Sequence, residues 1–386
     1  MNPALADLIK ISRDTGADPT LVQGGGGNTS VKTADGKYMY IKASGTALKD
    51  MNAKVGWRRL RLETALSVVK DKEIAQMEPQ KRELKVVDRL LEACDDNVKI
   101  EARPSVEAHL HACLEKCVIH LHPSAAGAFV NAKNGWAKLQ DLFKAEKLTP
   151  LWVPYTDPGY MLAKRIARLV DAYKEQFGKG PAILFLEKHG LFITAPTADT
   201  AVRLVRRVIR QCNSKLKQPP KGNPRPVGPE KIDAATACID EAHTQGTGEK
   251  TKVWYYYNAA IEEFMRLKDA RKMLAGCLTP DELVYASGPA MWVEKCDVRS
   301  IAARLKRQIA AGKKHSAAFL VKGVGLIAAG TERMAPTVRD IVLYSIFIRT
   351  NAARMGGILT LNKRQEEFIN NWESEAFRKK LADGKR

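Results

Sequence analysis

The sequence predicts an α/β protein, with an α/β/α layered domain followed by a smaller α/β domain. Three observations favour this fold class: strand-like and helix-like stretches alternate in the first half, a proline-rich segment interrupts the chain, and a stretch behind it echoes one before it. A chain of 386 residues also exceeds one ordinary core. We expect a first domain over 1–216, a linker over 217–231 and a smaller domain over 232–386.

The first domain shows two kinds of periodic pattern. Apolar residues at helical spacing predict helices over 5–13, 104–113, 159–173 and 198–212, the second opening on Pro104, which a first helical turn tolerates. Short apolar or β-branched runs between turn residues predict strands over 28–32, 37–44, 118–121, 182–186 and 191–194. The turns at Thr33–Gly36 and Lys188–Gly190 place a hairpin at each end of the domain. Together these patterns favour a sheet covered by helices on both faces.

The proline-rich segment runs from Lys217 to Pro229. Its repeated prolines forbid a helix or a central strand, so it predicts an extended linker.

The echoed stretch is Leu184–Ala195, which Phe319–Ala329 resembles. If Gly190 corresponds to Gly325, then His189 corresponds to Val324, and the second copy has lost the imidazole. The second domain would then be a degenerate, metal-free partial repeat with a structural or substrate-closing role, although a similarity of this length can also arise by chance.

Composition limits the class of protein. Hydrophobic residues make up 45% of the chain, which is typical of a globular protein, and no apolar run approaches the roughly 20 residues that span a bilayer. The first residues lack the pattern of a signal peptide. The seven cysteines are odd in number and show no paired spacing. We therefore expect a cytoplasmic protein with no membrane partner.

The formal net charge of +20 is high. Such a field attracts anions such as phosphorylated metabolites, but basic residues also cover the outer faces of ordinary helices, as over Arg203–Arg210. Because no nucleic-acid motif accompanies the charge, specific nucleic-acid binding is not expected.

Three of the seven histidines have the spacing of a metal site. His120 and His122 form an H-x-H at the end of a predicted strand, where side chains two apart share a face. His189 lies in the glycine turn at the end of another strand. Three imidazoles with an open position are typical of a catalytic metal site. The alternative is a coincidental H-x-H and a histidine that only caps a turn.

The other titratable candidates carry weaker signals. Glu107 precedes the H-x-H and could act as a general base beside a cation, or simply be a helix-surface acid. His109 and His111 fall in the predicted helix, where residues two apart diverge, so we interpret them as core, surface or outer hydrogen-bonding residues. His243 and His315 have no partner in sequence and are interpreted as surface residues.

Two glycine-containing turns could bind an anion. Gly24–Ser30 enters a strand and Ala43–Thr46 leaves one, so exposed backbone N–H groups would join side-chain donors from Asn28, Ser30, Ser44 and Thr46. Ser105 adds a donor near a predicted helix N-terminus. The spacing matches neither a Walker loop nor a dinucleotide fingerprint, and a glycine run can also be a plain flexible turn.

Taken together, the motifs resemble the class II aldolase/adducin superfamily. They occur in the family's order: Gly25–Lys32, Lys42–Thr46, Arg103–Glu107, His120–Pro123 and Lys188–Leu191. Val153–Lys164 and the region after the linker look closest to the aldolase part of rhamnulose-phosphate aldolase/lactaldehyde dehydrogenase-type proteins. The resemblance covers most of the chain.

This resemblance implies a mixed, mainly antiparallel sheet and a set of roles. His120, His122 and His189 would hold a divalent metal, usually Zn²⁺, and Glu107 would be the catalytic acid/base. Asn28, Ser44, Gly45 and Ser105 would hold the phosphate of a small sugar phosphate. It further implies a homo-oligomer, often a tetramer.

The implied activity is a lyase that cleaves a ketose 1-phosphate to dihydroxyacetone phosphate and an aldehyde. An epimerase or dehydratase acting at the same metal-enediolate site is the alternative, and an adducin-like binding protein without catalysis is an alternative of another class. No dinucleotide fingerprint follows a strand, so dehydrogenase activity is not expected. The second acid is not assigned by sequence, with Tyr155, Tyr160 and Tyr255–Tyr257 as candidates.

Overall fold

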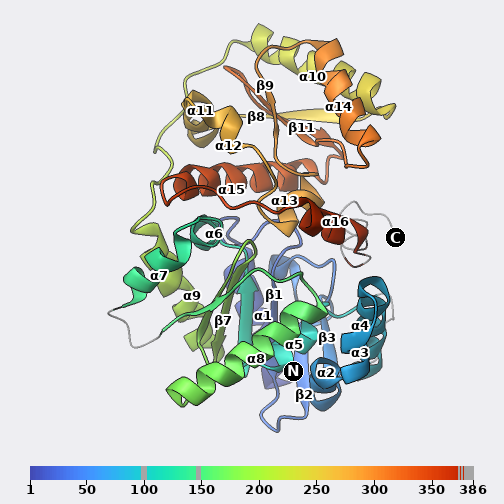
Figure 1. Cartoon of the computed structure of the whole chain (residues 1–386), viewed down its shortest axis with the longest axis vertical. Helices are drawn as coiled ribbons and strands as arrows, with labels where there is room; N and C mark the ends of the chain where they lie inside the picture. The colour runs from blue at the N-terminus through green and yellow to red at the C-terminus, as the bar shows by residue number, and fades with distance from the viewer. Residues whose placement is uncertain (97–101, 145–148, 373, 375–376, 378–386) are drawn as a thin grey trace. The chain divides into compact units, whose positions relative to one another are not determined.

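The computed structural model describes residues 1–96, 102–144, 149–372, 374 and 377. Within them the chain divides into two compact units (Figure 1). Unit 1 comprises Met1–Val130, Gly135–Lys215 and a segment beginning at Glu367, and unit 2 comprises Asn131–Asn134 and Leu216–Glu366. None of the helices described combines the length and the apolar character that a membrane crossing would need.

Unit 1 is built on a seven-stranded sheet with the order β3-β2-β1-β4-β7-β6-β5. Neighbouring strands are antiparallel except β5 and β6, which are parallel. The strands are β1 (Asn28–Lys32), β2 (Tyr38–Lys42), β3 (Trp57–Arg61), β4 (Cys117–Leu121), β5 (Leu151–Val153), β6 (Ile183–Leu186) and β7 (Gly190–Ala195). The predicted mixed, mainly antiparallel sheet is confirmed.

Helices cover both faces of this sheet. On one face α1 and α9 contact each other and pack on β1 and β7, while α2, α5 and α8 pack together on the other, where α8 crosses in front of the strands in Figure 1. The helices are α1 (Pro3–Gly16), α2 (Leu62–Lys70), α3 (Lys72–Gln76), α4 (Pro79–Ala93), α5 (Ala108–Ala112), α6 (Ser124–Val130), α7 (Gly135–Phe143), α8 (Tyr160–Phe177) and α9 (Ala198–Asn213), with a 3₁₀ turn at Leu48–Asp50. The predicted α/β/α layering is confirmed.

The core forms because each helix turns one apolar stripe to the sheet. Leu162, Ile166 and Val170 on α8 recur at helical spacing and pack with Leu184 and Phe192 of the sheet. At about 25 cal/mol per Å² of apolar surface, stripes of this kind dominate the stability of the unit.

One predicted helix is shorter than expected. The pattern predicted a helix from Pro104 to Cys113, but α5 begins only after Glu107, its N-cap residue. The physical reason is that Pro104 forms a β-bridge with Ala43, and the Ser105 N–H donates to Lys42 O at 2.9 Å. Pro104 and Ser105 therefore form an extended segment that pairs with the residues at the end of β2. Glu107 follows this segment at the N-terminus of α5.

Unit 2 has its own four-stranded sheet with the order β8-β11-β10-β9. Buried residues of α10 and α14 form one core with the sheet, and α15 contacts β8, β10 and β11. The strands are β8 (Lys252–Tyr256), β9 (Met291–Val293), β10 (Ala318–Val321) and β11 (Gly325–Gly330). The helices are α10 (Pro229–Thr247), α11 (Ala259–Arg266), α12 (Ala270–Met273), α13 (Pro280–Tyr285), α14 (Val298–Ala310) and α15 (Ala335–Ala353), while α16 (Lys363–Asn371) spans the division between the units.

Unit 2 repeats the topology of half of unit 1. In unit 1, β5 is parallel to β6, β6 is antiparallel to β7, and β7 is antiparallel to β4. In unit 2 the same relations join β9, β10, β11 and β8 in the same chain order. The similarity noticed over one hairpin in the sequence thus extends to four strands.

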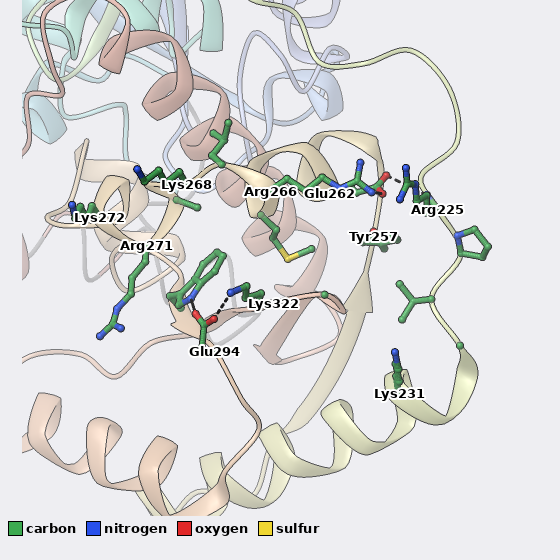
Figure 2. Close-up of a pocket in the computed structure, with 18 residues that line it drawn as sticks. Arg225, Lys231, Tyr257, Glu262, Arg266, Lys268, Arg271, Lys272, Glu294 and Lys322 are labelled. Carbon is green, nitrogen blue, oxygen red and sulfur yellow. Dashed lines mark hydrogen bonds and ion pairs between the residues drawn. The ribbon is translucent and has the colours of Figure 1, made fainter.

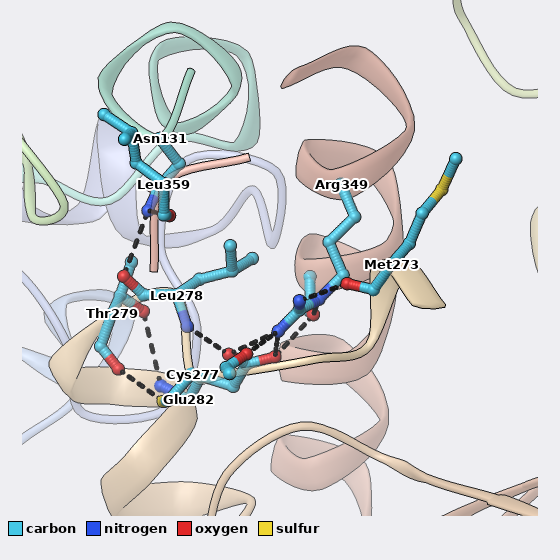
Figure 3. Close-up of polar contacts among 10 residues, drawn as sticks. Asn131, Met273, Cys277, Leu278, Thr279, Glu282, Arg349 and Leu359 are labelled. Atoms are coloured by element: carbon cyan, nitrogen blue, oxygen red, sulfur yellow. Dashed lines mark hydrogen bonds and ion pairs between the residues drawn. The ribbon is translucent and has the colours of Figure 1, made fainter. Parts of the chain in front are cut away.

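A buried ion pair organises the loops of unit 2 (Figure 3). Arg349 on α15 is fully buried, and its Nη2 lies 3.0 Å from both carboxylate oxygens of Glu282. Nη2 also donates to Gly276 O, while Nε donates to Ser345 Oγ and Nη1 to Met273 O. The Glu282 carboxylate also accepts the Leu278 N–H at 2.6 Å. Because both charges are fully hydrogen-bonded, the desolvation cost of the pair is offset.

Candidate metal centre and active site

The three predicted ligand histidines converge on one point in unit 1. His120 and His122 stand at the end of β4, and β4 pairs with β7 so that Leu121 faces Leu191, which brings the β6–β7 turn with His189 beside them. The Nε2 atom of His120 lies 3.0 Å from that of His122 and 3.3 Å from that of His189. One ligand atom from each residue lies within 4.8 Å of the others.

This arrangement fits a divalent cation. Three nitrogens bound tetrahedrally at about 2.0–2.1 Å would stand roughly 3.3 Å apart, close to the spacing of the imidazoles. Burial lowers the pKa of His120 well below its usual value, so its ring is neutral, the form that binds metals. Its Nδ1 lies 3.1 Å from Leu191 O, and its ring stacks on Phe192, which aims Nε2 at the other two rings.

Gly190, the residue after His189, must be a glycine because atoms of β4 and His122 lie too close to leave room for a side chain. A Cβ atom on Gly190 would lie 2.5 Å from Leu121 O and 2.8 Å from His122 Cδ2. Only a residue without a side chain lets the two strands bring the imidazoles together. The preceding Lys188 adopts the left-handed conformation with φ 54°, which turns the chain so that His189 faces β4.

Glu107 joins this cluster from a different part of the chain. Its carboxylate oxygens lie 3.7 Å from His120 Nε2 and 3.9 Å from His189 Nε2, and Asn28 Nδ2 donates to it at 2.6 Å. Burial acts to raise the pKa of Glu107, but at the acidic pH at which it titrates the protonated rings of His120 and His189, together with the Asn28 hydrogen bond, lower it to about 2. Glu107 is therefore an ionised carboxylate held beside the imidazoles.

The predicted anion-binding residues fall into two groups. Asn28 and Ser105 contact Glu107, since Asn28 Nδ2 donates to its carboxylate and the Glu107 N–H donates to Ser105 Oγ at 3.3 Å. Ser44 instead contacts the segment before Ser105, where its N–H donates to Arg103 O at 2.8 Å and its hydroxyl to Pro104 O at 3.1 Å. The Asn28 side-chain oxygen is buried and has no partner among the described residues. Gly45, with φ 80°, and Thr46 follow Ser44 in a turn that is exposed at Gly45.

Ser30 is placed differently from the other predicted donors. It is fully buried, and its hydroxyl lies 2.8 Å from His111 Nδ1. The structure thus joins Ser30 to the core of the unit and leaves it outside the group around Glu107.

The remaining histidines do not join the cluster. His109 and His111 are fully buried on α5, and burial lowers the pKa of His109 to about 4 and that of His111 to about 3, so both are neutral. In unit 2, His243 is buried rather than exposed as expected, because its ring packs edge-on against His315 with centroids 5.0 Å apart.

Two residues that shape the site have roles that the sequence did not predict. Phe192 supports the His120 ring at a centroid distance of 4.0 Å, and Lys188 supplies the left-handed turn. The contact of Phe192 follows from the sheet register, in which β7 pairs it with His120, so it became visible only in the structure. Of the tyrosines considered for the second acid, Tyr160 is excluded, since it is buried and its hydroxyl donates to Asp71 O at 2.8 Å.

Comparison with known proteins points to one family. The family model for the class II aldolase and adducin N-terminal domain matches residues 6–216. The protein named uncharacterized oxidoreductase YuxG from Bacillus subtilis is 25% identical over 420 residues, covering 97% of this chain. The chain spans 58% of the length of that relative.

Solved structures with the same kind of domain are also similar. The N-terminal class II aldolase domain of a conserved protein from Thermoplasma acidophilum is 28% identical, with a TM-score of 0.46, covering 55% of this chain and 94% of that one. The L-fuculose-1-phosphate aldolase from Thermus thermophilus is 17% identical, with a TM-score of 0.33 and the same coverage of 55% and 94%.

Class II aldolases use a divalent metal, and the cluster of His120, His122 and His189 offers three ligands for one. The family model covers more than half of the chain and contains all three histidines together with Glu107. This chain belongs to the class II aldolase and adducin N-terminal domain family.

Proposed function

We propose that the chain is a metal-dependent lyase that cleaves a ketose 1-phosphate to dihydroxyacetone phosphate and an aldehyde. The observation that carries this proposal is the convergence of an ionised carboxylate, Glu107, on three imidazole nitrogens. A binding protein without catalysis has no need of a buried carboxylate beside a metal site, because burying that charge is costly.

In this proposal His120, His122 and His189 hold a divalent cation, with Zn²⁺ as the expected metal. When bound, the cation supplies Lewis-acid polarisation of the substrate's carbonyl and hydroxyl oxygens. Asn28 fixes one oxygen of Glu107, so the carboxylate is held in place and ionised.

Glu107 moves the proton. In the condensation direction the ionised carboxylate accepts a proton from the carbon next to the carbonyl of dihydroxyacetone phosphate, and that carbon then forms the C–C bond with the aldehyde, whose oxygen takes up a proton. In the cleavage direction the proton of the aldol hydroxyl passes to the Glu107 carboxylate, the C–C bond breaks, and Glu107 gives that proton to the carbon, which restores the carboxylate. Asn28, Ser44, Gly45, Thr46 and Ser105 are proposed to hold the phosphate, so that binding energy away from the reacting atoms positions them.

We further propose that the chain corresponds to the aldolase part of rhamnulose-phosphate aldolase/lactaldehyde dehydrogenase-type proteins. The chain aligns over 58% of a relative that is named an oxidoreductase, and Val153–Lys164 carries the nearer resemblance. We also propose that copies of this chain form a homo-oligomer.

The test is release of dihydroxyacetone phosphate from rhamnulose, fuculose, ribulose and 5-deoxyribulose 1-phosphates, with and without added zinc or chelator. We expect zinc-dependent release from at least one sugar, and at least a 100-fold loss of kcat in Glu107→Gln, since general acid–base catalysis contributes roughly 10²–10⁴. Glu175→Gln, an exposed carboxylate on α8, is the matched control and should keep full activity.

Two outcomes would redirect the proposal. A protein that binds zinc but releases nothing from any sugar would favour an epimerase or dehydratase at the same site. A protein purified without chelator that holds no metal would favour a binding protein.

A further inference from the structure

Unit 2 contains an open cleft with a strong excess of positive charge (Figure 2). It has a volume of about 710 Å³ and is lined by residues of the linker and α10, of the α11–α12 region, of the ends of β8 and β9, and of the β10–β11 turn. Seven lining residues are Lys or Arg and two are Glu. Such an excess of cations around a concave site attracts anions.

Both glutamates of the cleft already have partners. Glu294 forms an ion pair with Lys322 and accepts the Trp292 indole N–H at 2.8 Å. Glu262 forms an ion pair with Arg266 and accepts the Arg225 N–H at 3.1 Å. Among the described residues, neither Lys268 nor Arg271 forms an ion pair within 4 Å, and Arg271 only helps to lower the pKa of Glu294 from a longer distance, so both cations remain available to a ligand.

Further arginines line a pocket that adjoins the cleft. A second pocket of about 460 Å³ shares Arg271 and Trp292 with the cleft and is also lined by Arg304 and Arg307. Arg304 is half-buried and donates to Trp292 O at 2.7 Å. Burial, together with the charges of Arg271 and Arg307, lowers the pKa of Arg304, which means that three guanidinium groups lie close enough to repel one another. A bound anion would relieve this repulsion.

The cleft occupies the place in unit 2 that the histidine cluster occupies in unit 1. In the sheet registers Leu121 faces Leu191 and Tyr256 faces Leu326, so Tyr257 corresponds to His122 when Gly190 is matched with Gly325. By the same match Lys322 and Gly323 of the β10–β11 turn correspond to Glu187 and Lys188. Tyr257, Lys322 and Gly323 all line the cleft.

We propose that unit 2 binds a small phosphorylated molecule in this cleft, with Lys268 and Arg271 as its principal contacts. The repeat has kept a ligand site at the same turn but has exchanged the metal-binding imidazoles for side-chain cations, which bind phosphate directly. A volume of about 710 Å³ fits a metabolite rather than a nucleic-acid duplex. Tyr257, which lines the cleft and is half-buried, offers apolar surface for the body of such a ligand.

The test uses the full-length chain and isothermal titration calorimetry with inorganic phosphate, pyrophosphate and fructose 1,6-bisphosphate. We expect at least one of the two doubly phosphorylated probes to bind, and the Lys268→Gln/Arg271→Gln variant to bind it at least 10-fold more weakly. Both side chains are exposed, so the variant should melt at the wild-type temperature. Arg299→Gln, an exposed arginine of α14 outside both pockets, is the control and should bind like the wild type.

The His189→Ala chain separates this site from the proposed active site, because binding in the cleft should survive that change. The proposal is overturned if none of the probes binds, or if the double variant binds as tightly as the wild type. It is also overturned if binding is lost in His189→Ala but kept in the double variant. Binding of a 12-nucleotide single strand that displaces the probe with higher affinity would show a nucleic-acid surface and would equally overturn it.

Discussion

His120 and His189 are held in place by different means. The His120 ring lies between Leu191 O and the face of Phe192, so the sheet fixes its orientation. His189 instead depends on the backbone, since its N–H donates to Leu186 O at 3.1 Å in a turn whose preceding residue, Lys188, is left-handed. A left-handed non-glycine residue is strained by about 1 kcal/mol, and such strain persists where the surrounding structure determines it.

At this residue scale, His189→Ala should lower the zinc content. Removing one of three ligands should cost more than the ~10–100-fold in affinity that loss of an outer hydrogen-bond partner costs. The measurement is inductively coupled plasma mass spectrometry after purification without chelator. Val324→Ala, the corresponding position of unit 2, is the control and should keep the metal. Full zinc occupancy in His189→Ala would contradict the assignment of this ligand.

Gly190→Ala should weaken metal binding without removing a ligand. The added Cβ would meet Leu121 O at 2.5 Å and the His122 ring at 2.8 Å, so β7 must move away from β4. We expect a loss of about 1–3 kcal/mol in the free energy of unfolding and roughly 10-fold weaker zinc binding. Thermal melting and competition with a zinc chelator measure the two effects. Gly180→Ala, where the nearest neighbouring atom is 3.8 Å from the new Cβ, should change neither.

At the scale of elements, β1 has an unusual sequence for a buried strand. Asn28, Thr29, Ser30 and Lys32 are all buried, although only Val31 is apolar. Each polar side chain has a partner: Asn28 binds Glu107, Thr29 binds Ser12, and Ser30 binds His111. β1 can therefore lie inside the sheet, because its buried polar side chains form hydrogen bonds with residues of neighbouring elements.

Lys32 connects this strand to the end of α5. Its ammonium group donates to the carbonyl oxygens of His111, Leu114 and Glu115, and burial lowers its pKa to about 8. Between pH 8 and the usual lysine pKa of about 10.5, the unfolded chain binds a proton that the folded chain lacks, so this residue makes the fold more stable as pH rises. Below pH 8 both states are protonated and the cost of burying the charge is fully present.

Lys32→Met should therefore lose stability by an amount that grows with pH. At pH 7 we expect a loss of about 1–3 kcal/mol because three carbonyls lose a donor. Between pH 8 and 10 the gap between the wild type and the variant should widen by up to about 3 kcal/mol. Chemical denaturation followed by circular dichroism at pH 7, 8.5 and 10 measures it. A gap that stays constant or narrows would contradict a depressed lysine pKa.

The local sequence pattern is sufficient to predict the bounds of some elements but not of others. The strands over 28–32 and 118–121 were predicted within one residue, because their ends are marked by turn residues. The helix predicted from Pro104 failed at its start because a tertiary pairing with Ala43 competes with the local preference. Helical propensity is a weak constraint that such pairings override.

At the scale of the whole molecule, the pair of Glu282 and Arg349 should be decisive for unit 2. Arg349→Met would leave the Glu282 carboxylate buried and uncompensated, which we expect to cost about 3–5 kcal/mol. Adding Glu282→Gln removes that charge but keeps an acceptor for the Leu278 N–H, so the double variant should recover part of the loss. Differential scanning calorimetry compares the variants, and a double variant less stable than Arg349→Met would contradict the argument.

The repeat that relates unit 2 to unit 1 is also a feature of the whole molecule. The sequence showed one similar hairpin, whereas the pairing of four strands in each unit shows that the similarity includes β4 and β5 with β8 and β9. Those strands have diverged in sequence, with Tyr257 at the position that corresponds to His122 in unit 1. The domain boundaries expected from the sequence remain a prediction, namely that each of the two domains folds independently of the other.

The sequence by itself determined the α/β/α layering and the three candidate ligands, because strand ends, glycine turns and the H-x-H spacing are local features. The mixed sheet was expected only from the resemblance to the family. Only the tertiary structure decided that Glu107 is an ionised group beside those imidazoles, that Ser30 belongs to the core, and that Lys268 and Arg271 line a basic cleft. These properties depend on distances between segments far apart in the chain and on burial. Neither is specified by any local pattern, since both arise only when the elements pack.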